Sequence, residues 1–508
     1  MEQAIRLLAD LNESTFSEED GKRKDAKAGM RQAGRGKHPW KDTYYGRRAR
    51  ENRSVWCWSG LLALLCTFIS YPGIWYSDSY VRVATGSAVL NAVVKTLTGH
   101  RFVLETGNAF TVIPSFFLAA SLGMTGHVGL YTFVQAFSFF AAVFLLLRAL
   151  NPAWRRAQAL LFALCPLVYG VSVYYEANIG SLVGIIGLLL LFRDAGEEKT
   201  GKERAVEFLL VALSAFVSFG YRTNALTVVP VLVVWLWQET RGKAKRWLPL
   251  CAMAAGLALV WLVPWAFGVQ SQSNGTTGFV WEMITTIQRM DAEDQAEYAD
   301  YLDEIGGEGA TRALLESSTE VSANDFMWGE AINTAKLSAP GASGKAIRKY
   351  FQLIREKPGA WFQVKKDFVL RALGVPKTLD YSEYNYNRWE GMGEYGFNDS
   401  RQRWAFYASY LWMNEKMSFL VGRPWVMFLL SLLLMMIEWV RKNGKRHLYA
   451  VMFWTAVFSY GAYLVVIVGF EVRFFYPALL LMLAMDGAIL LEWLRAGTLW
   501  LGRKWRKE

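Results

Sequence analysis

The chain has 508 residues, of which 53% are hydrophobic, 15% aromatic and only 19% charged, and its formal net charge is +11. Soluble domains carry about 25% charged residues, so this composition argues against a soluble protein and excludes a disordered chain, a fibrous protein and a disulfide scaffold. The four cysteines lie in apolar runs and the four histidines are scattered, so the sequence indicates no disulfide framework and no zinc site.

The N-terminal residues 1–54 are polar, and their basic residues outnumber the acidic ones. Their mixed charge and low apolar content predict a disordered tail without a cleavable signal peptide. The excess of Lys and Arg places this tail in the cytoplasm.

Long apolar runs follow, and a membrane-spanning helix needs about 20 such residues. The predicted spans are 55–70, 127–147, 157–175, 178–192, 205–220, 224–238, 247–268, 420–440, 448–469 and 474–494. The fold class is therefore an all-α polytopic membrane protein with about ten transmembrane helices. Seven of these spans belong to an N-terminal module (55–268) and three to a C-terminal module (420–494).

One further apolar run, 109–124, does not cross the membrane in our interpretation. If it does not cross, the basic clusters after the spans, such as 193–204, 241–246 and 441–446, all fall on the cytoplasmic side, and so does the tail 495–508. If it crossed, these clusters would face outward. We therefore expect both termini in the cytoplasm and an interfacial apolar helix at 109–124.

Two regions lie outside the membrane in this topology: the first outer loop (71–126) and an extracytoplasmic domain (269–419). The domain is expected to be mainly helical. Its acidic segment 291–308 predicts a solvated helix, and the amphipathic segment 358–374 predicts a helix on the membrane surface. The aromatic segment 380–407 fits internal packing or a sugar-stacking face.

A few charged residues lie in or near the outer ends of the spans, where charges beside hydrocarbon are costly and suggest function. They are Asp78, Arg82, Lys95, Arg101, Glu105, Glu176, Arg222, Glu471 and Arg473. Arginine binds phosphate oxygens through two nitrogens, and a carboxylate can act as general base on a hydroxyl. We expect Arg222 and Arg473 to hold a leaving phosphate while Asp78 activates an acceptor.

Each of these residues also has a purely structural interpretation. Asp78 and Glu176 could cap helices, Arg222 could extend along the membrane interface, and Glu471 and Arg473 could pair with other helices. His100, Glu105 and Glu471 are candidates for acceptor binding or support. Asp486 is the one acid deep within a span; it fits a hydrogen bond to a neighbouring helix better than a proton relay.

The order of these features resembles the GT-C superfamily of polytopic membrane glycosyltransferases. TyrProGly at 71–73 and then Asp78 follow the first span, Glu176 follows the third, PheGlyTyrArgThrAsn (219–224) follows the fifth, and GluValArgPhePheTyrPro (471–477) precedes the last. The resemblance implies catalysis by Asp78 with help from Glu176, and contacts of Arg222 and Arg473 with the phosphate of a polyprenyl-phosphate-linked sugar. No cofactor is firmly indicated; a divalent cation, Mg²⁺ or Mn²⁺, would bind at Asp78 and Glu176.

The expected function is transfer of a hexose or pentose, with inversion, to a glycan, lipid or protein acceptor at the outer face of a bacterial plasma membrane. Membrane lipids are expected partners and nucleic acid is not. Three alternatives stay open: a transporter or flippase of lipid-linked sugars, an O-antigen polymerase or ligase, and a non-catalytic scaffold.

Overall fold

The computed structural model describes residues 43–70, 77–99, 104–105, 112–151, 176–242, 247–267, 269–270, 275–306, 342–379, 408–409, 412, 415–465 and 472–505. Several sequence predictions lie outside these residues: the tail up to residue 42, the 71–73 motif, His100, the span 157–175, the aromatic segment 380–407 and Glu471.

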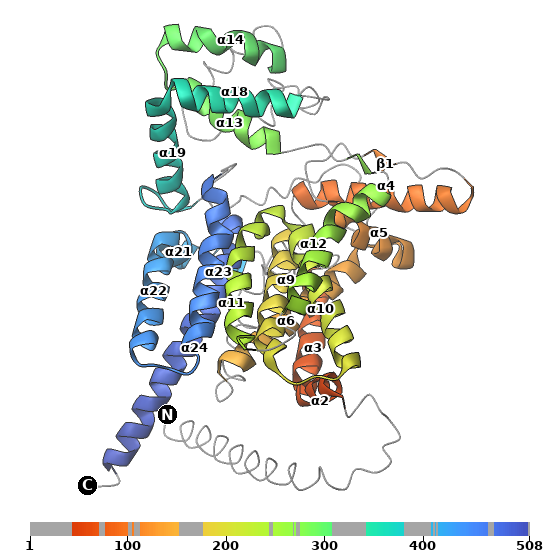
Figure 1. Cartoon of the computed structure of the whole chain (residues 1–508), viewed down its shortest axis with the longest axis vertical. Helices are drawn as coiled ribbons and strands as arrows, with labels where there is room; N and C mark the ends of the chain where they lie inside the picture. Colours follow the sequence, from red (N-terminus) through yellow and green to blue (C-terminus); the bar gives the residue numbers. More distant parts are fainter. Residues whose placement is uncertain are drawn as a thin grey trace.

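A bundle of long apolar helices forms the centre of the molecule, running roughly parallel in Figure 1. Six of the described helices are long and apolar enough to cross a membrane: Gly129–Leu150, Ala177–Gly196, Gly201–Tyr221, Trp247–Ala266, Arg446–Val465 and Phe474–Thr498. Three apolar helices are shorter: Arg53–Phe68, Ile113–Thr125 and Pro424–Val440. The chain is thus a helical, multi-pass membrane protein, and the predicted count of ten spans is not confirmed.

The described residues begin with α2 (Tyr44–Glu51) and α3 (Arg53–Ser70) and continue through α4 (Ser77–Leu97) and α5 (Ile113–Thr125) to α6 (Gly129–Leu150). The predicted interfacial run 109–124 is therefore largely helical. Helices α4 and α5 pack on each other and lie across one end of the bundle, where Figure 1 draws α4 nearly at right angles to α3. Leu118 of α5 is fully buried against Val83 of α4.

The next helices are α9 (Glu176–Arg193), the 3₁₀ turn η2 (Asp194–Gly196), α10 (Gly201–Tyr221), η3 (Thr223–Val228), α11 (Val229–Glu239) and α12 (Trp247–Ala266). The predicted span 224–238 is thus divided into a 3₁₀ segment and a short helix, because Pro230 lies in the first turn of α11, where its missing N–H breaks no helical hydrogen bond.

Helices α9, α10 and α12 approach one another closely through small residues, as helices in lipid commonly do. A Cβ atom on Gly256 of α12 would lie 2.2 Å from the carbonyl oxygen of Ala212 of α10, and a Cβ atom on Gly184 of α9 would lie 2.5 Å from that of Ser214. Both positions therefore require glycine.

The last three bundle helices are α22 (Pro424–Val440), α23 (Arg446–Val465) and α24 (Val472–Trp505), preceded by the short α21 (Ser418–Val421). Helix α24 contacts α6, α9, α22 and α23. It also continues beyond the predicted end of its span at 494, and Figure 1 shows it projecting past the other helices.

Four helices of the predicted extracytoplasmic region stand together beyond one end of the bundle: α13 (Gly275–Ile287), α14 (Ala292–Gly306), α18 (Ala342–Glu356) and α19 (Pro358–Ala372) (Figure 1). They enclose a core of their own that includes Trp281, Ile284 and Leu353. We call this end of the bundle the distal end, and the opposite end, where α2 and η2 lie, the basic end.

The acidic segment is helical as predicted, and Asp291, Glu293 and Glu297 are exposed. The amphipathic segment forms α19, but this helix does not lie across the end of the bundle. Figure 1 shows it running along the bundle axis and joining the distal helices to α21. Its apolar residues Val364 and Phe368 are buried against protein, so a packed protein face satisfies the amphipathic pattern without a membrane surface.

One strand pair, two residues long on each side, accompanies the helices. β1 (Leu104–Glu105) and β2 (Val269–Gln270) pair in parallel, with Glu105 opposite Gln270. The pair ties the first outer loop to the end of α12, at the distal end of the bundle.

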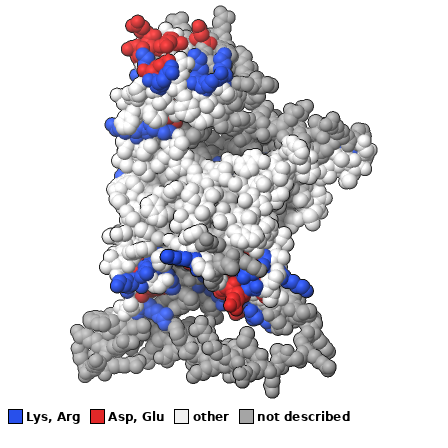
Figure 2. Space-filling model, viewed as in Figure 1, with Lys and Arg blue, Asp and Glu red and all other residues white. Residues whose placement is uncertain are grey.

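Charged side chains lie at the two ends of the described molecule, separated on the face seen in Figure 2 by a band almost free of Lys, Arg, Asp and Glu. The basic end carries α2, η2 and the turn between α22 and α23, which includes Arg441 and Lys445. The predicted basic clusters at 193–204 and 441–446 thus gather at one end.

Candidate functional site

The distal end of the bundle brings together backbone positions that the sequence singled out. Glu176 begins α9, and Arg222 caps the C-terminus of α10. These two ends are neighbours, since a Cβ atom on Gly180 would lie 2.0 Å from the ring of Tyr221. Because α9 and α10 are antiparallel around a short connection, the start of one must meet the end of the other.

Arg222 is the best-described member of this group. Its backbone is extended (φ −144°, ψ 113°), which ends α10 and turns the chain into η3. The Nε atom of Arg222 is buried and has no hydrogen-bond partner among the described residues. The guanidinium carbon lies 5.9 Å from the centre of the Phe474 ring. A buried guanidinium nitrogen without a partner is costly, so this nitrogen is available to an acceptor that the described residues do not supply.

Phe474 connects Arg222 to the start of α24. The Phe474 ring lies 4.8 Å from that of Tyr463 in α23, and Arg473 is its neighbour in sequence. Thr227 of η3 donates a hydrogen bond of 2.7 Å to the carbonyl of Phe458. The Phe474 ring thus connects the guanidinium of Arg222 to the start of α24, where Arg473 precedes Phe474 in sequence.

The first outer loop reaches the same end of the bundle. Asp78 lies in the first turn of α4, four residues before Arg82, whose side chain is 3% exposed. Asp78 and Arg82 therefore lie on the same face of α4, because positions four apart on a helix share a face. Val83 packs in a cluster with Tyr131, and Tyr131 donates a hydrogen bond of 3.4 Å to the hydroxyl of Tyr221. A chain of contacts thus links α4 to the residue before Arg222.

Asp78, Glu105, Glu176 and Arg473 are described through their backbone only, so their roles stay predictions. Glu105 lies in β1 at the distal end. In the part of the chain that the structure describes, no group of three or more His, Cys, Asp or Glu side chains is placed to hold a metal ion.

A buried polar network lies beside this site, in the distal helices, and sequence analysis missed it. Glu282 of α13 is 2% exposed. Its carboxylate accepts hydrogen bonds of 2.8 Å from the Tyr350 hydroxyl and from Trp361 Nε1, and it forms a 2.8 Å ion pair with Lys365. Burial and the nearby Glu282 charge raise the pKa of Tyr350, so this hydroxyl stays protonated and donates.

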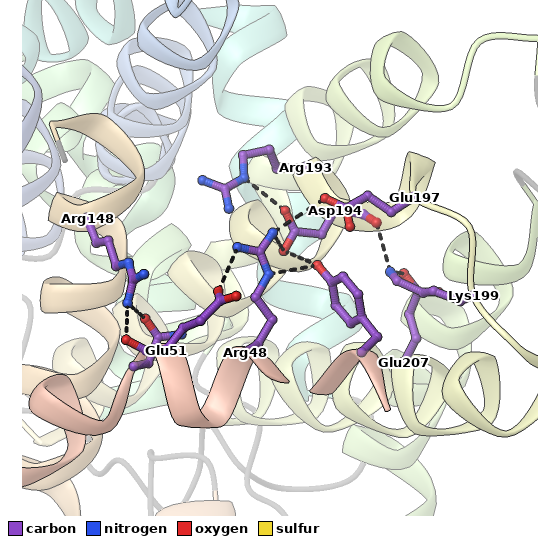
Figure 3. Close-up of polar contacts among 10 residues, drawn as sticks. Arg48, Glu51, Arg148, Arg193, Asp194, Glu197, Lys199 and Glu207 are labelled. Carbon is purple, nitrogen blue, oxygen red and sulfur yellow. Dashed lines mark hydrogen bonds and ion pairs between the residues drawn. The ribbon is translucent and has the colours of Figure 1, made fainter. Parts of the chain in front are cut away.

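A second network, drawn in Figure 3, lies at the basic end and was also missed. Lys199 and Glu207 form a 2.6 Å ion pair, with side chains only 1% and 3% exposed. The Lys199 ammonium also donates to the carbonyl of Asp194 and lies 5.0 Å from the centre of the Tyr44 ring. These contacts hold α2 against the turn between α9 and α10.

Further hydrogen bonds join α2 to η2 and to the start of α10. The Tyr44 hydroxyl donates a 2.8 Å hydrogen bond to Asp194, and burial together with the Asp194 charge raises the pKa of Tyr44. The Tyr44 amide donates to Glu203, the acid of a capping box with Thr200 at the start of α10. The amide and the hydroxyl of Thr200 also donate to the Glu203 carboxylate, so this carboxylate joins α2 to the start of α10.

Asp486 behaves as the sequence predicted. It is buried within α24 and accepts a 2.7 Å hydrogen bond from Ser431 of α22. Its other carboxyl oxygen, Oδ1, is buried without a partner among the described residues.

No protein-family model, curated protein or solved structure matches this chain. The functional assignment therefore rests on the residues and on their arrangement.

Proposed function

We propose that this protein is a membrane glycosyltransferase that takes a sugar from a polyprenyl-phosphate donor at the distal end of its bundle. The observation that carries the proposal is the Nε atom of Arg222, which is buried and has no hydrogen-bond partner among the described residues; the guanidinium carbon lies 5.9 Å from the ring centre of Phe474, the sequence neighbour of Arg473. A phosphate is the ligand that matches such a group, because guanidinium–phosphate hydrogen bonds are charge-assisted and bidentate.

The position of Arg222 favours a phosphate carried on a lipid. The residue caps the C-terminus of α10, one of the long apolar helices, at the end of the bundle beyond which Figure 1 shows the distal helices. A polyprenyl phosphate that is embedded in the bilayer presents its headgroup at this depth. The apolar helix α5, which packs on both α4 and α10, lies at the same end of the bundle (Figure 1).

The proposed reaction is a displacement at the anomeric carbon of the donor sugar. An acceptor hydroxyl attacks that carbon as its proton passes to the Asp78 carboxylate. The bond between the anomeric carbon and the phosphate oxygen breaks, and polyprenyl phosphate leaves with the bonding pair. Attack opposite the leaving group inverts the anomeric centre. Arg222 and Arg473 stabilise the charge on the leaving phosphate, and Glu176 assists at the acceptor.

The test measures release of free polyprenyl phosphate, because this product is common to all donors of the class. Purified protein would be supplied with polyprenyl-phosphate-linked hexoses and pentoses in bacterial membranes that contain envelope acceptors. We expect release by the wild-type protein and none by Asp78→Asn, with equal amounts of both proteins in the membrane. Wild-type release by Asp78→Asn would refute the role of Asp78.

A flippase of lipid-linked sugars is the second candidate, and Asp486 is the observation that favours it. A buried acid within a span is typical of transport pathways, and Asp486 keeps one oxygen without a partner among the described residues. A scrambling assay in proteoliposomes without any acceptor separates the two functions: a flippase moves the lipid-linked sugar across the bilayer there, and a glycosyltransferase does not.

A further inference from the structure

The ion pair between Glu282 and Lys365 joins the distal helices to the bundle. The Lys365 ammonium donates both to the Glu282 carboxylate, at 2.8 Å, and to the backbone carbonyl of Val465. Val465 is the last residue of α23, and the last carbonyls of a helix have no partner within that helix. Lys365 therefore satisfies a carbonyl that α23 leaves open, at the end where a cation is also favoured by the helix dipole.

Glu282 holds Lys365 in this position. The carboxylate is buried and also accepts from Tyr350 and Trp361, which lie on α18 and α19. The Lys365 side chain is only 16% exposed. Its ammonium thus has a defined place between a fixed carboxylate in the distal helices and a helix end in the bundle.

The end of α23 lies close to the candidate phosphate site. Two residues before Val465, the ring of Tyr463 packs on Phe474 at 4.8 Å, and Phe474 in turn supports the guanidinium of Arg222. A shift of the end of α23 would therefore move the rings of Tyr463 and Phe474. It would change the contact of Phe474 with the Arg222 guanidinium and move the start of α24, which includes Arg473.

We propose that Lys365 is a positioning residue: by holding the Val465 carbonyl it fixes the outer end of α23 and keeps Arg222 oriented for its ligand. This inference rests on the proposed function in one respect only, namely that the ligand of Arg222 is a polyprenyl phosphate. The contact also explains how the distal helices, which make no described contact with Arg222 itself, take part in the same site.

The first experiment measures binding of farnesyl phosphate, a short polyprenyl phosphate, to the full-length protein in detergent. We expect Lys365→Met to weaken binding about five- to tenfold, and Lys365→Arg, which keeps a cation and its donors, to restore much of it. The matched control is Lys357→Met. Lys357 pairs with Asp294 within the distal helices, and this variant should bind as the wild type does. Equal affinities of Lys365→Met and Lys357→Met would overturn the inference.

A double variant separates positioning from simple loss of a buried pair. Lys365→Met leaves Glu282 as a buried charge without its counter-ion, which is destabilising in itself. Glu282→Leu with Lys365→Met removes that charge, while Trp361 still donates to the Tyr350 hydroxyl. The double variant still lacks the contact to Val465, so we expect its binding to stay weak. Recovery of wild-type affinity would show a purely structural role and overturn the inference.

A second readout needs no ligand. In a background with the four native cysteines replaced, Arg222→Cys reports the environment of position 222 through its rate of labelling by a charged maleimide. We expect Lys365→Met to raise this rate several-fold and Lys357→Met to leave it unchanged. If Lys365→Met raises the labelling rate but neither the wild type nor any variant binds farnesyl phosphate, the proposed function fails and the positioning role stands. If Lys365→Met and Lys357→Met give equal labelling rates at position 222, the positioning role fails.

Discussion

Lys199 and Glu207 lie 2.6 Å apart at the basic end of the bundle, and both side chains are almost fully withdrawn from solvent. The two residues belong to a stretch whose charges look like an ordinary cytoplasmic loop. Their burial arises because α2 folds over them and places the ring of Tyr44 against the ammonium. The burial of this ion pair therefore depends on α2.

Loss of one member of this pair should be costly. We expect Lys199→Met to destabilise the protein by about 3–5 kcal/mol, because it leaves a buried carboxylate without its partner. Lys199→Met with Glu207→Leu should recover most of that loss. Unfolding in mixed micelles gives the measurement. Arg355→Ala is the control, since Arg355 is 80% exposed in its pair with Glu356 and such pairs contribute about 0–1 kcal/mol.

Arg222 should be indispensable to any reaction at the distal end. We expect Arg222→Met to lower the rate of polyprenyl phosphate release by about 100-fold, the usual effect of removing one donor from a dry site. Arg222→Lys should recover only part of the rate, because an ammonium lacks the planar fork. Arg289→Met, which removes an arginine that pairs with Asp367 in the distal helices, should leave the rate unchanged. A normal rate in Arg222→Met would exclude Arg222 from the site.

Gly374 should tolerate no side chain. It follows α19 with φ of +70°, and an added Cβ atom would lie 2.5 Å from the carbonyl oxygen of Gly422. We expect Gly374→Ala to destabilise the protein by about 1–3 kcal/mol, through backbone strain and displacement of the α19–α21 junction. Gly344→Ala is the matched control, because nothing lies within 4 Å of the added atom there. Similar stabilities of the two variants would contradict the close approach.

Alkaline pH should weaken the distal helices. Burial, followed by the charge of Glu282, raises the pKa of Tyr350 above its usual value of about 10. Above this pH the unfolded chain loses the tyrosine proton while the folded chain keeps it, so the folded state binds more protons and its stability falls as pH rises. We expect Tyr350→Phe to show a shallower loss of stability above about pH 10 than the wild type. Equal slopes would show that Tyr350 ionises normally.

The sequence predicts the arrangement of the bundle better than the contacts within it. Apolar length and the positions of basic residues such as Arg193 and Arg441 are properties of local segments, and they correctly anticipated the helical bundle and the gathering of these charges at one end. Arg222 lies over the ring of Phe474 at the start of α24, and the roles assigned to Arg222 and Arg473 stay predictions. Pro230 could have indicated that the span 224–238 is divided, because proline marks the first turn of a helix.

The buried ion pairs could not be foreseen in this way. Glu282 and Lys365 are 83 residues apart, and Lys365 reaches Val465 over a further 100 residues. Neither residue stands out locally, since charged residues in a polar domain are normally solvated. Only the packing of α13, α18 and α19 turns Glu282 into a buried acceptor. The same reason explains why the amphipathic pattern of α19 did not distinguish a membrane surface from a protein face.

The attachment of α2 also constrains the order in which the molecule is assembled. The amide of Tyr44 pairs with Glu203, 159 residues later in the chain. At a synthesis rate of about 5–20 residues per second, α2 is synthesised roughly 8–30 seconds before Glu203. The contacts of α2 with η2 and the start of α10 can therefore form only after these later segments have been synthesised.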